Sequence, residues 1–221
     1  MTAPSTTRLD DVSHHFVTDE EEIHLFDQLS FVLNAGQVTS IVGASGAGKS
    51  SLLAIAAGLE DPKRGTITYT VKGEAVSSAD FRKHTGFIFQ HFHLLPEMDA
   101  LNNLALPLRL KGDAEAFPKA REWLELIGLS GRANHKPSQL SGGEQQRIAI
   151  ARAFISKPDF IFADEPTGNL DQKTATAISD LMLSFAKETG CGLVIVTHSA
   201  ELAGLAQSQF KLDNRVLERV V

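Results

Sequence analysis

Eight residues in the first quarter of the chain have the types and spacing needed to hold a polyphosphate. Residues 43–50 read GASGAGKS and lie between two apolar runs, 38–42 and 52–57. The glycines let backbone N–H groups turn inward around an anion, Lys49 can reach the terminal phosphates, and the Ser50 hydroxyl can ligate Mg²⁺. The flanking runs predict a strand before the loop and a helix that begins at Gly48, with its positive dipole end facing the same anion.

Further polar residues stand at the carboxyl ends of short apolar runs. They are Gln90 after residues 86–89, Asp164 and Glu165 after 160–163, and His198 after 193–196. Buried parallel strands deliver side chains to one edge of a sheet in this way. A glycine pair, Gly142 and Gly143, precedes a helical pattern that runs from about Glu144 through Ile155. The start of that helix is a second candidate anion site.

The composition limits what the chain can be. Its 221 residues can bury the core of one large domain, or of one domain with small subdomains. A formal net charge of -6 and the lack of a dense lysine and arginine cluster argue against nucleic acid as a partner. The single cysteine, Cys191, favours a reducing compartment. Because no run approaches the ~20 apolar residues of a membrane span, and residues 1–5 carry no signal pattern, we expect a cytoplasmic chain.

The first third of the chain favours antiparallel strands. Residues 8–16 and 23–33 show partly alternating apolar positions and are separated by acidic residues at 19–22. We therefore expect two antiparallel strands joined by a solvated loop. Residues 65–71 predict a further strand, which ends at a turn at Lys72 and Gly73.

The rest of the chain alternates strands with helices. Residues 100–128 predict a helical segment, in which Pro107 and Pro118 would mark boundaries or kinks. The remaining predicted elements are a strand at 160–163, an amphipathic helix at 171–187, a strand at 193–196, a short helix, and terminal strands at 209–212 and 216–220. This alternation favours an α/β fold with a parallel sheet and right-handed crossovers.

Taken together, the motifs resemble in order and spacing those of the ATP-binding subunits of ABC transporters. They are GASGAGKS at 43–50, Gln90, LSGGEQQR at 140–147, FIFADE at 160–165, GNLD at 168–171 and His198. The residues around Gln90 and the stretch DEPTGNLD at 164–171 are most similar to the bacterial lipoprotein-release, macrolide-export and cell-division ATPases. Within that subgroup, the nearest likeness is the uncharacterised exporter ATPase encoded as a separate small subunit.

The resemblance implies a single ABC ATPase domain over residues 1–221. Its P-loop NTPase core, with a parallel sheet and an N-terminal antiparallel β subdomain, would occupy about 1–90 and 158–221. A helical subdomain that carries the signature loop would occupy 91–157.

The resemblance also implies Mg²⁺-dependent hydrolysis of ATP to ADP and phosphate. Glu165 would polarise the attacking water as general base, and His198 would hold the γ-phosphate and that water in line. The residues implied in catalysis are Glu165, His198, Lys49 and Gln90, and the Mg²⁺ ligands are Ser50, Gln90 and Asp164. The residues expected to contact the nucleotide are Phe16, Gly43, Ser45, Gly46, Ala47, Gly48, Lys49, Ser50, Ser51, Ser141, Gly142, Gly143 and Asp171.

The signature loop implies a pair of chains. In the family, residues at the positions of Ser141 and Gly143 contact the γ-phosphate of ATP bound to the opposite subunit, and Asp171 would lie at the junction. Each site would therefore need two copies arranged head to tail. The resemblance further implies an integral membrane permease as partner, and a peripheral place on the cytoplasmic face of the bacterial inner membrane.

Some residues have a second interpretation. By residue type alone, Phe16 would more often be a core residue, although its position is that of the family's adenine-stacking aromatic. Glu165 could be an ordinary strand-end carboxylate, and His198 considered alone could be a surface histidine. The apolar residues at 92–98 could belong to the core of the helical segment or form a groove that receives a permease helix.

Two other classes of protein use the same phosphate loop. A soluble ABC-type ATPase that acts on nucleic acid or ribosomes is the alternative function, although such proteins carry a coiled coil before the signature loop or a second cassette. A small-molecule kinase or a GTPase would lack the residues at 140–147 and, for guanine, would need an Asn-Lys-x-Asp motif that is absent.

Overall fold

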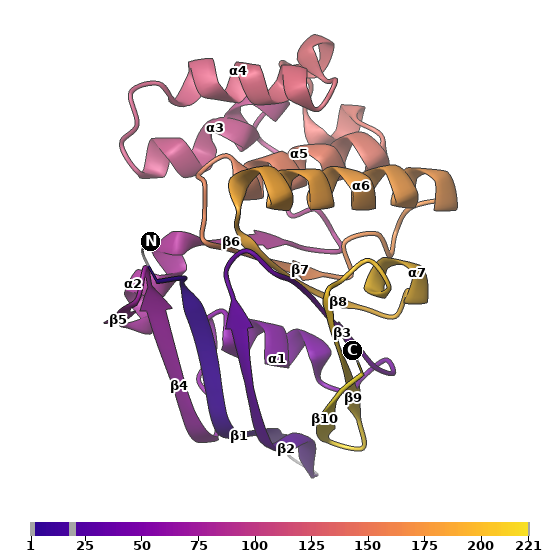
Figure 1. The fold of residues 1–221 in the computed structure, drawn as a ribbon. Helices are drawn as coiled ribbons and strands as arrows, with labels where there is room; N and C mark the ends of the chain where they lie inside the picture. The colour runs from indigo at the N-terminus through magenta and orange to yellow at the C-terminus, as the bar shows by residue number, and fades with distance from the viewer. Residues whose placement is uncertain (1–2, 18–20, 221) are drawn as a thin grey trace.

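The computed structural model describes residues 3–17 and 21–220, which form two sheets and a layer of helices (Figure 1). The strands are β1 (Thr6–Val17), β2 (Glu22–Asn34), β3 (Val38–Val42), β4 (Arg64–Val71), β5 (Glu74–Val76), β6 (Thr85–Ile88), β7 (Phe160–Asp164), β8 (Gly192–Thr197), β9 (Ser208–Asp213) and β10 (Val216–Arg219). The helices are α1 (Lys49–Ala56), α2 (Ser78–Phe81), α3 (Ala100–Leu110), α4 (Ala116–Leu126), α5 (Gly142–Phe154), α6 (Gln172–Thr189) and α7 (Ala200–Ala203). Short 3₁₀ turns lie at η1 (Arg82–His84), η2 (Ser130–Arg132) and η3 (Pro137–Gln139).

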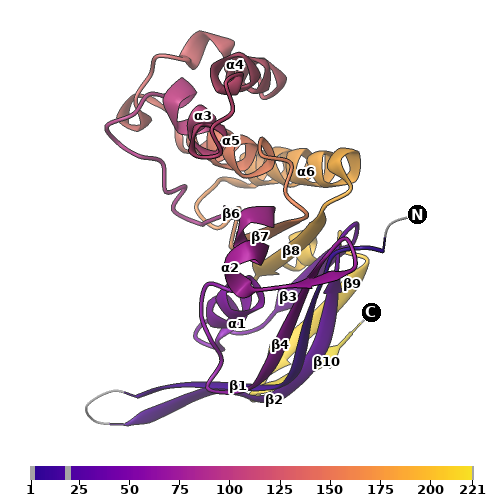
Figure 2. The same cartoon turned by 90° about the vertical axis from the view of Figure 1, so that its left-hand side faces the viewer.

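The N-terminal strands form an antiparallel sheet in the order β2-β1-β4-β5. The predicted strands at 8–16 and 23–33 pair with each other as β1 and β2, which form a hairpin that projects to the lower left in Figure 2. Asp19 and Glu20 of the predicted acidic loop lie outside the described residues. The assignment of Glu22 to that loop is wrong, because β2 begins at Glu22 and pairs it with Val17.

The larger sheet has the order β10-β9-β3-β8-β7-β6. Its strands β9, β3, β8, β7 and β6 are parallel, and β10 runs antiparallel to β9 at one edge. Every residue of β8 and nearly all of β7 are buried, as expected for continuous apolar runs covered on both faces. Because carboxyl ends of parallel strands meet at one edge, the loops after β3, β6, β7 and β8 come together there.

The predicted helical segment at 100–128 consists of two helices, α3 and α4, which pack against each other and against α5. The break between them lies at 111–115, so Pro107 does not mark a boundary, whereas Pro118 stands close to the start of α4. Pro107 lies inside α3, and Pro118 lies in the first turn of α4, where the missing N–H would have no partner within the helix.

Two hydrophobic clusters lie on opposite faces of the parallel sheet. One face of β7 contributes Ile161 and Ala163 to a cluster with α3, α4, α5 and α6. The other face contributes Phe160 and Phe162 to a cluster with α1 and the antiparallel sheet. Cys191 is buried in the first cluster with a free thiol. Among the described residues, no helix combines the length and apolarity required of a membrane span.

Candidate functional site

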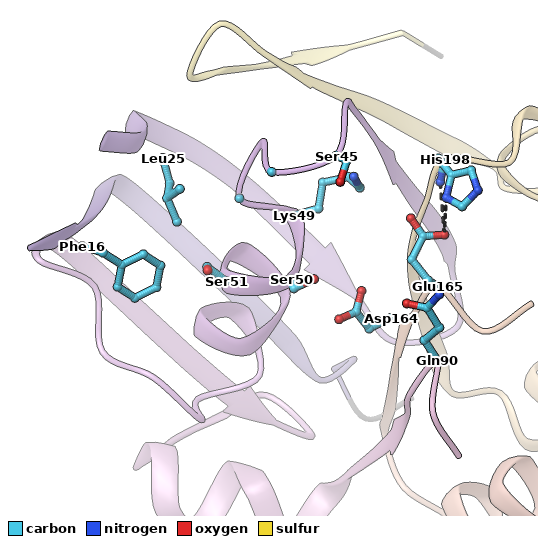
Figure 3. A pocket seen from close by; sticks show the side chains of 12 residues that line it. Phe16, Leu25, Ser45, Lys49, Ser50, Ser51, Gln90, Asp164, Glu165 and His198 are labelled. Carbon is cyan, nitrogen blue, oxygen red and sulfur yellow. Dashed lines mark hydrogen bonds and ion pairs between the residues drawn. The ribbon is translucent and has the colours of Figure 1, made fainter. Parts of the chain in front are cut away.

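A cleft of about 490 Å³ lies at the carboxyl edge of the parallel sheet, beside the β1–β2 hairpin (Figure 3). Its lining residues are Phe16, Leu25, Ser45, Gly46, Gly48, Lys49, Ser50, Ser51, Gln90, Asp164, Glu165 and His198. All of them except Leu25 are residues that the sequence predicted to bind nucleotide, bind metal or act in catalysis. Leu25 belongs to β2, and its apolar type made it look like an ordinary strand residue.

The loop between β3 and α1 leaves backbone N–H groups available to an anion. Gly48 is the N-cap of α1 with φ 93°, and no side chain caps this helix start. Gly46 also has a positive φ, 79°. A Cβ on Gly48 would lie 2.9 Å from the Cβ of Leu25, so glycine suits both the conformation and the contact. An uncapped helix start that faces a cleft is suited to bind phosphate.

Lys49 is held above this loop. Its ammonium group donates hydrogen bonds to the carbonyl oxygens of Gly43 at 3.0 Å and Ala44 at 2.9 Å. The side chain is buried, so its charge acts where water screens it poorly. Gly43 and Ala47 do not line the cleft themselves. Gly43 contributes the carbonyl that Lys49 contacts, and the N–H of Ala47 closes the loop on Ala44 at 3.2 Å.

The donor set around Asp164 fits a small, hard cation. Burial raises the pKa of Asp164 and the nearby charge of Glu165 adds to the effect, whereas a hydrogen bond with Ser50 and the charge of Lys49 lower it. The Gln90 amide nitrogen donates to Asn169 Oδ1 at 3.3 Å, and the Gln90 amide oxygen points towards Asp164 (Figure 3). A hydroxyl, an amide oxygen and a carboxylate are the oxygen ligands that Mg²⁺ prefers.

Glu165 and His198 come from the ends of adjacent parallel strands and meet in the cleft. Oε2 of Glu165 accepts hydrogen bonds from Thr197 Oγ1 at 3.1 Å and from the backbone N–H of His198 at 3.3 Å. The Nδ1 atom of His198 lies 2.9 Å from the same oxygen. Glu165 has φ 44°, a left-handed conformation that is strained for a non-glycine residue and is typical of functional sites.

The residues of the signature loop, LSGGEQQR at 140–147, lie outside the cleft. Ser141 is the N-cap of α5 in a reciprocal capping box with Glu144: Glu144 N–H donates to Ser141 Oγ at 3.3 Å, and Ser141 N–H donates to Glu144 Oε2 at 2.8 Å. The backbone hydrogen bond from Ser141 lowers the pKa of Glu144, and an ion pair with Arg132 adds to this.

Asp171 lies next to this stretch as the N-cap of α6. It accepts hydrogen bonds from both the N–H and the hydroxyl of Thr174. A Cβ on Gly143 would lie 2.8 Å from Thr174 Cγ2, so the starts of α5 and α6 are in close contact. Gly142 lies beside Leu170 and Phe92. Ser141, Gly142, Gly143 and Asp171 thus form one surface, separate from the cleft.

The family model described as ABC transporter matches residues 26–168, more than half of the chain. This chain belongs to the ABC transporter family. It is 41% identical over 210 residues to the lipoprotein-releasing system ATP-binding protein LolD of Alcanivorax borkumensis, with 91% of each chain covered. It is also 43% identical over 208 residues to the uncharacterized ABC transporter ATP-binding protein YbbA of Escherichia coli K12, with 90% of each chain covered.

Solved ABC cassettes have the same architecture. A dimeric post-hydrolysis state of the ATP-binding cassette MJ0796, bound to ADP and Pi, superimposes with a TM-score of 0.84 and is 34% identical, covering 97% of this chain and 99% of that one. The predicted fold class, and the prediction of an ATP-binding and ATP-hydrolysing subunit of an ABC transporter that uses ATP and Mg²⁺, are therefore confirmed. The roles of individual residues stay predictions.

Proposed function

We propose that two copies of the chain bind ATP between them head to tail, and that this pair drives an integral membrane permease from the cytoplasmic face of the bacterial inner membrane. The observation that supports the pair most directly is the separation of two motif surfaces within one chain. Lys49, Glu165 and His198 line the cleft, whereas Ser141 and Asp171 lie outside it. A second copy would supply the missing surface. The MJ0796 cassette is described as dimeric, in agreement with this arrangement.

In the proposed reaction, water attacks the γ-phosphorus and the bond to the β–γ bridging oxygen breaks. Glu165 accepts the proton of the water, and His198, which contacts the Glu165 carboxylate, holds the water and the γ-phosphate in line. Lys49 and the N–H groups at the start of α1 offset the charge that develops on the phosphates. Ser50, Gln90 and Asp164 would hold Mg²⁺, which when bound would neutralise part of the charge on the phosphates.

Phe16 is proposed as the platform for the adenine ring. Its side chain lines the cleft and is 42% exposed, so the face of the ring is accessible to a ligand. Its ring makes an edge-to-face contact with His14, with centroids 5.1 Å apart, which holds the ring in place. A phenylalanine can stack on a base but cannot form the hydroxyl contact that a tyrosine would add.

We also propose that residues 1–221 fold as one ABC ATPase domain, with the helical subdomain at 91–157 between the two parts of the core. The packing supports one domain, because α3, α4 and α5 share a hydrophobic cluster with Ile161 and Leu193 of the parallel sheet. The helical part has no separate core that would let it fold alone.

The segment after Gln90 is the proposed contact with the permease. Leu95 is 38% exposed there, while Leu94 packs partly against the hydrophobic cluster. The guanidinium of Arg152 holds the segment by donating to the carbonyl oxygens of His93 at 2.7 Å and Phe92 at 3.0 Å. An exposed apolar side chain on a braced loop is suited to receive a helix from a membrane subunit.

A mixing experiment tests the shared site. Lys49→Ala removes the phosphate contact from one surface, and Ser141→Arg blocks the other. If each site is built from two copies, either variant alone hydrolyses little ATP, but their mixture contains pairs with one intact site and regains turnover. A Ser141→Arg variant with normal turnover by itself would contradict the shared site.

The alternative function, a soluble ATPase that acts on nucleic acid or ribosomes, predicts that nucleic acid or ribosomes, and not a permease, stimulate ATP hydrolysis. We expect turnover to change when the chain is reconstituted with a detergent-solubilised permease from the same organism, and to be insensitive to added DNA, RNA or ribosomes. Stimulation by nucleic acid or ribosomes, with none by the permease, would favour the alternative.

A further inference from the structure

Three side chains with metal-ligating groups converge on the β1–β2 hairpin. The Nε2 atom of His15 lies 3.1 Å from Oε1 of Glu22, and the Nε2 atom of His24 lies 3.3 Å from the same oxygen. The ligand atoms of the three residues all lie within 4.8 Å of one another. All three side chains are partly exposed, so an ion could reach them from solvent.

The pairing of the hairpin places these groups on one face. His15 is opposite His24, and Val17 is opposite Glu22, whereas Phe16 is opposite Ile23. Opposed residues of an antiparallel pair share a face, and residues two apart along a strand share it as well. His15, Glu22 and His24 therefore lie on the face opposite to Phe16, which lines the cleft.

We propose that His15, Glu22 and His24 form a binding site for a divalent transition-metal ion such as Zn²⁺, with a remaining position for water. Two imidazoles and one carboxylate are a ligand set that zinc accepts. Two atoms that each lie about 2.0–2.1 Å from one zinc ion at a tetrahedral angle are about 3.3 Å apart. The two nitrogen–oxygen distances of 3.1 and 3.3 Å match that spacing, so small side-chain shifts would complete the site.

The surroundings of the cluster favour a cation. The Nδ1 atom of His24 lies 3.9 Å from Oδ1 of Asp27, a carboxylate that adds negative charge beside the ligand atoms. The imidazoles of His15 and His24 also contact each other, with ring centroids 5.3 Å apart. Imidazole nitrogen favours zinc, copper and nickel over magnesium or calcium, so the site differs in selectivity from the oxygen-rich group at Asp164.

Metal binding would link β1 to β2 one residue away from Phe16. A link across the hairpin would fix the strand that carries this ring. Holding a contact residue in its bound position raises the affinity for ATP, because less conformational entropy is lost on binding. This consequence rests on the proposed role of Phe16 in adenine binding. The metal site itself does not depend on that role.

The site is tested by titrating the untagged full-length chain with Zn²⁺ in a calorimeter, in an Asp164→Asn background that weakens metal binding in the cleft. We expect one saturable site per chain, with affinity lowered at least tenfold by the double substitution His15→Ala and His24→Ala. His84→Ala, which removes an exposed histidine elsewhere, is the matched control and should bind Zn²⁺ as the background does. Unchanged affinity in the double variant, or no saturable binding, would overturn the proposal.

A second variant distinguishes the loss of a metal ligand from the loss of folding. Glu22→Gln keeps the size of the side chain and removes its charge, and far-UV circular dichroism checks that each variant is folded. With Co²⁺ in place of zinc, the background chain should show the visible absorption of a cobalt ion with nitrogen ligands, and folded Glu22→Gln should show weaker binding. If Glu22→Gln changed neither the absorption spectrum nor the affinity, Glu22 would not be a ligand of the metal ion.

The coupling to Phe16 has its own readout. With saturating Mg²⁺ present throughout, wild-type chain preloaded with one equivalent of Zn²⁺ should bind ATP several-fold more tightly than chain without Zn²⁺. Phe16→Ala should abolish this difference, and so should the double substitution His15→Ala and His24→Ala. Equal ATP affinity with and without bound zinc would overturn the coupling alone. A chain that binds zinc but does not bind ATP at all would instead contradict the proposed function.

Discussion

The Nδ1 atom of His198 lies 2.9 Å from Oε2 of Glu165, so the ends of two adjacent parallel strands are joined at the edge of the cleft. The same oxygen also accepts hydrogen bonds from Thr197 Oγ1 and from the His198 N–H. These contacts fix one oxygen of the proposed general base and hold the histidine beside it. The pair therefore behaves as one unit in the proposed reaction.

Removing the imidazole should slow chemistry more than it weakens binding. We expect His198→Ala to lower turnover by about 10²-fold or more, the cost of losing a group that stabilises charge in the transition state. ATP affinity should change little, because Lys49 and the phosphate loop are untouched. Steady-state turnover and equilibrium binding of a fluorescent ATP analogue measure the two effects separately. His84→Ala serves as the control, and normal turnover in His198→Ala would refute the assigned role.

The position of the paired groups at strand ends could be predicted from the sequence. Glu165 and His198 each follow a short run of apolar residues, and β7 and β8 are buried on both faces as such runs require. Neighbouring parallel strands then bring their carboxyl ends to one edge. The phosphate loop follows β3, which lies beside β8, and so reaches the same edge.

The position of the hairpin residues could not be predicted in this way. The sequence places Glu22 in a solvated loop, because an acidic run has no apolar alternation to mark the start of a strand. A register slip of one residue would move every side chain of β2 to the other face, and the alternation in the sequence is too irregular to exclude it. The convergence of His15, Glu22 and His24 therefore appears only once the pairing is known.

The sequence also does not show that Ser141 lies outside the cleft of its own chain. A motif at a helix start indicates an anion site, but it does not show whether the anion is bound to the same chain or to a second copy. The sequence does not identify Leu25 for a related reason, since only the approach of Gly48 to its Cβ shows that it borders the phosphate loop.

The single tyrosine offers a test of the packing behind the phosphate loop. Tyr69 donates a hydrogen bond to the carbonyl of Ile55 at 3.1 Å, and burial together with the charge of Asp61 raises the pKa of Tyr69 to about 12. Because the folded-state pKa is above the unfolded value of about 10, this group stabilises the fold fully below pH 10. That stabilisation is lost as the pH rises through about 12.

Absorbance of the tyrosinate measures this pKa directly, since the chain has one tyrosine. We expect ionisation near pH 12 in the folded chain and near 10 in denaturant, with circular dichroism to follow unfolding. Ionisation near pH 10 in a chain that is still folded would contradict the burial of Tyr69.

Two glycine substitutions should differ in their effect on stability. A Cβ on Gly43 would lie 2.5 Å from the carbonyl oxygen of Leu212, a backbone atom that cannot move without shifting β9. We expect Gly43→Ala to destabilise the fold by about 1–3 kcal/mol and to weaken ATP binding by displacing the loop. Gly131→Ala is the matched control, because a Cβ there meets nothing within 4 Å. Urea denaturation measures both, and equal stability of the two variants would contradict the predicted clash.

The central claim is that each ATP lies between two copies of the chain. Light scattering of the Glu165→Gln variant with Mg²⁺ and ATP tests it most directly, because slow hydrolysis should preserve the closed pair. The account predicts a mass of twice 23.9 kDa with ATP, and 23.9 kDa when Ser141→Arg is added to the same variant. A mass that stays at 23.9 kDa with ATP fully bound, together with normal turnover of Ser141→Arg in an otherwise unchanged chain, would contradict it.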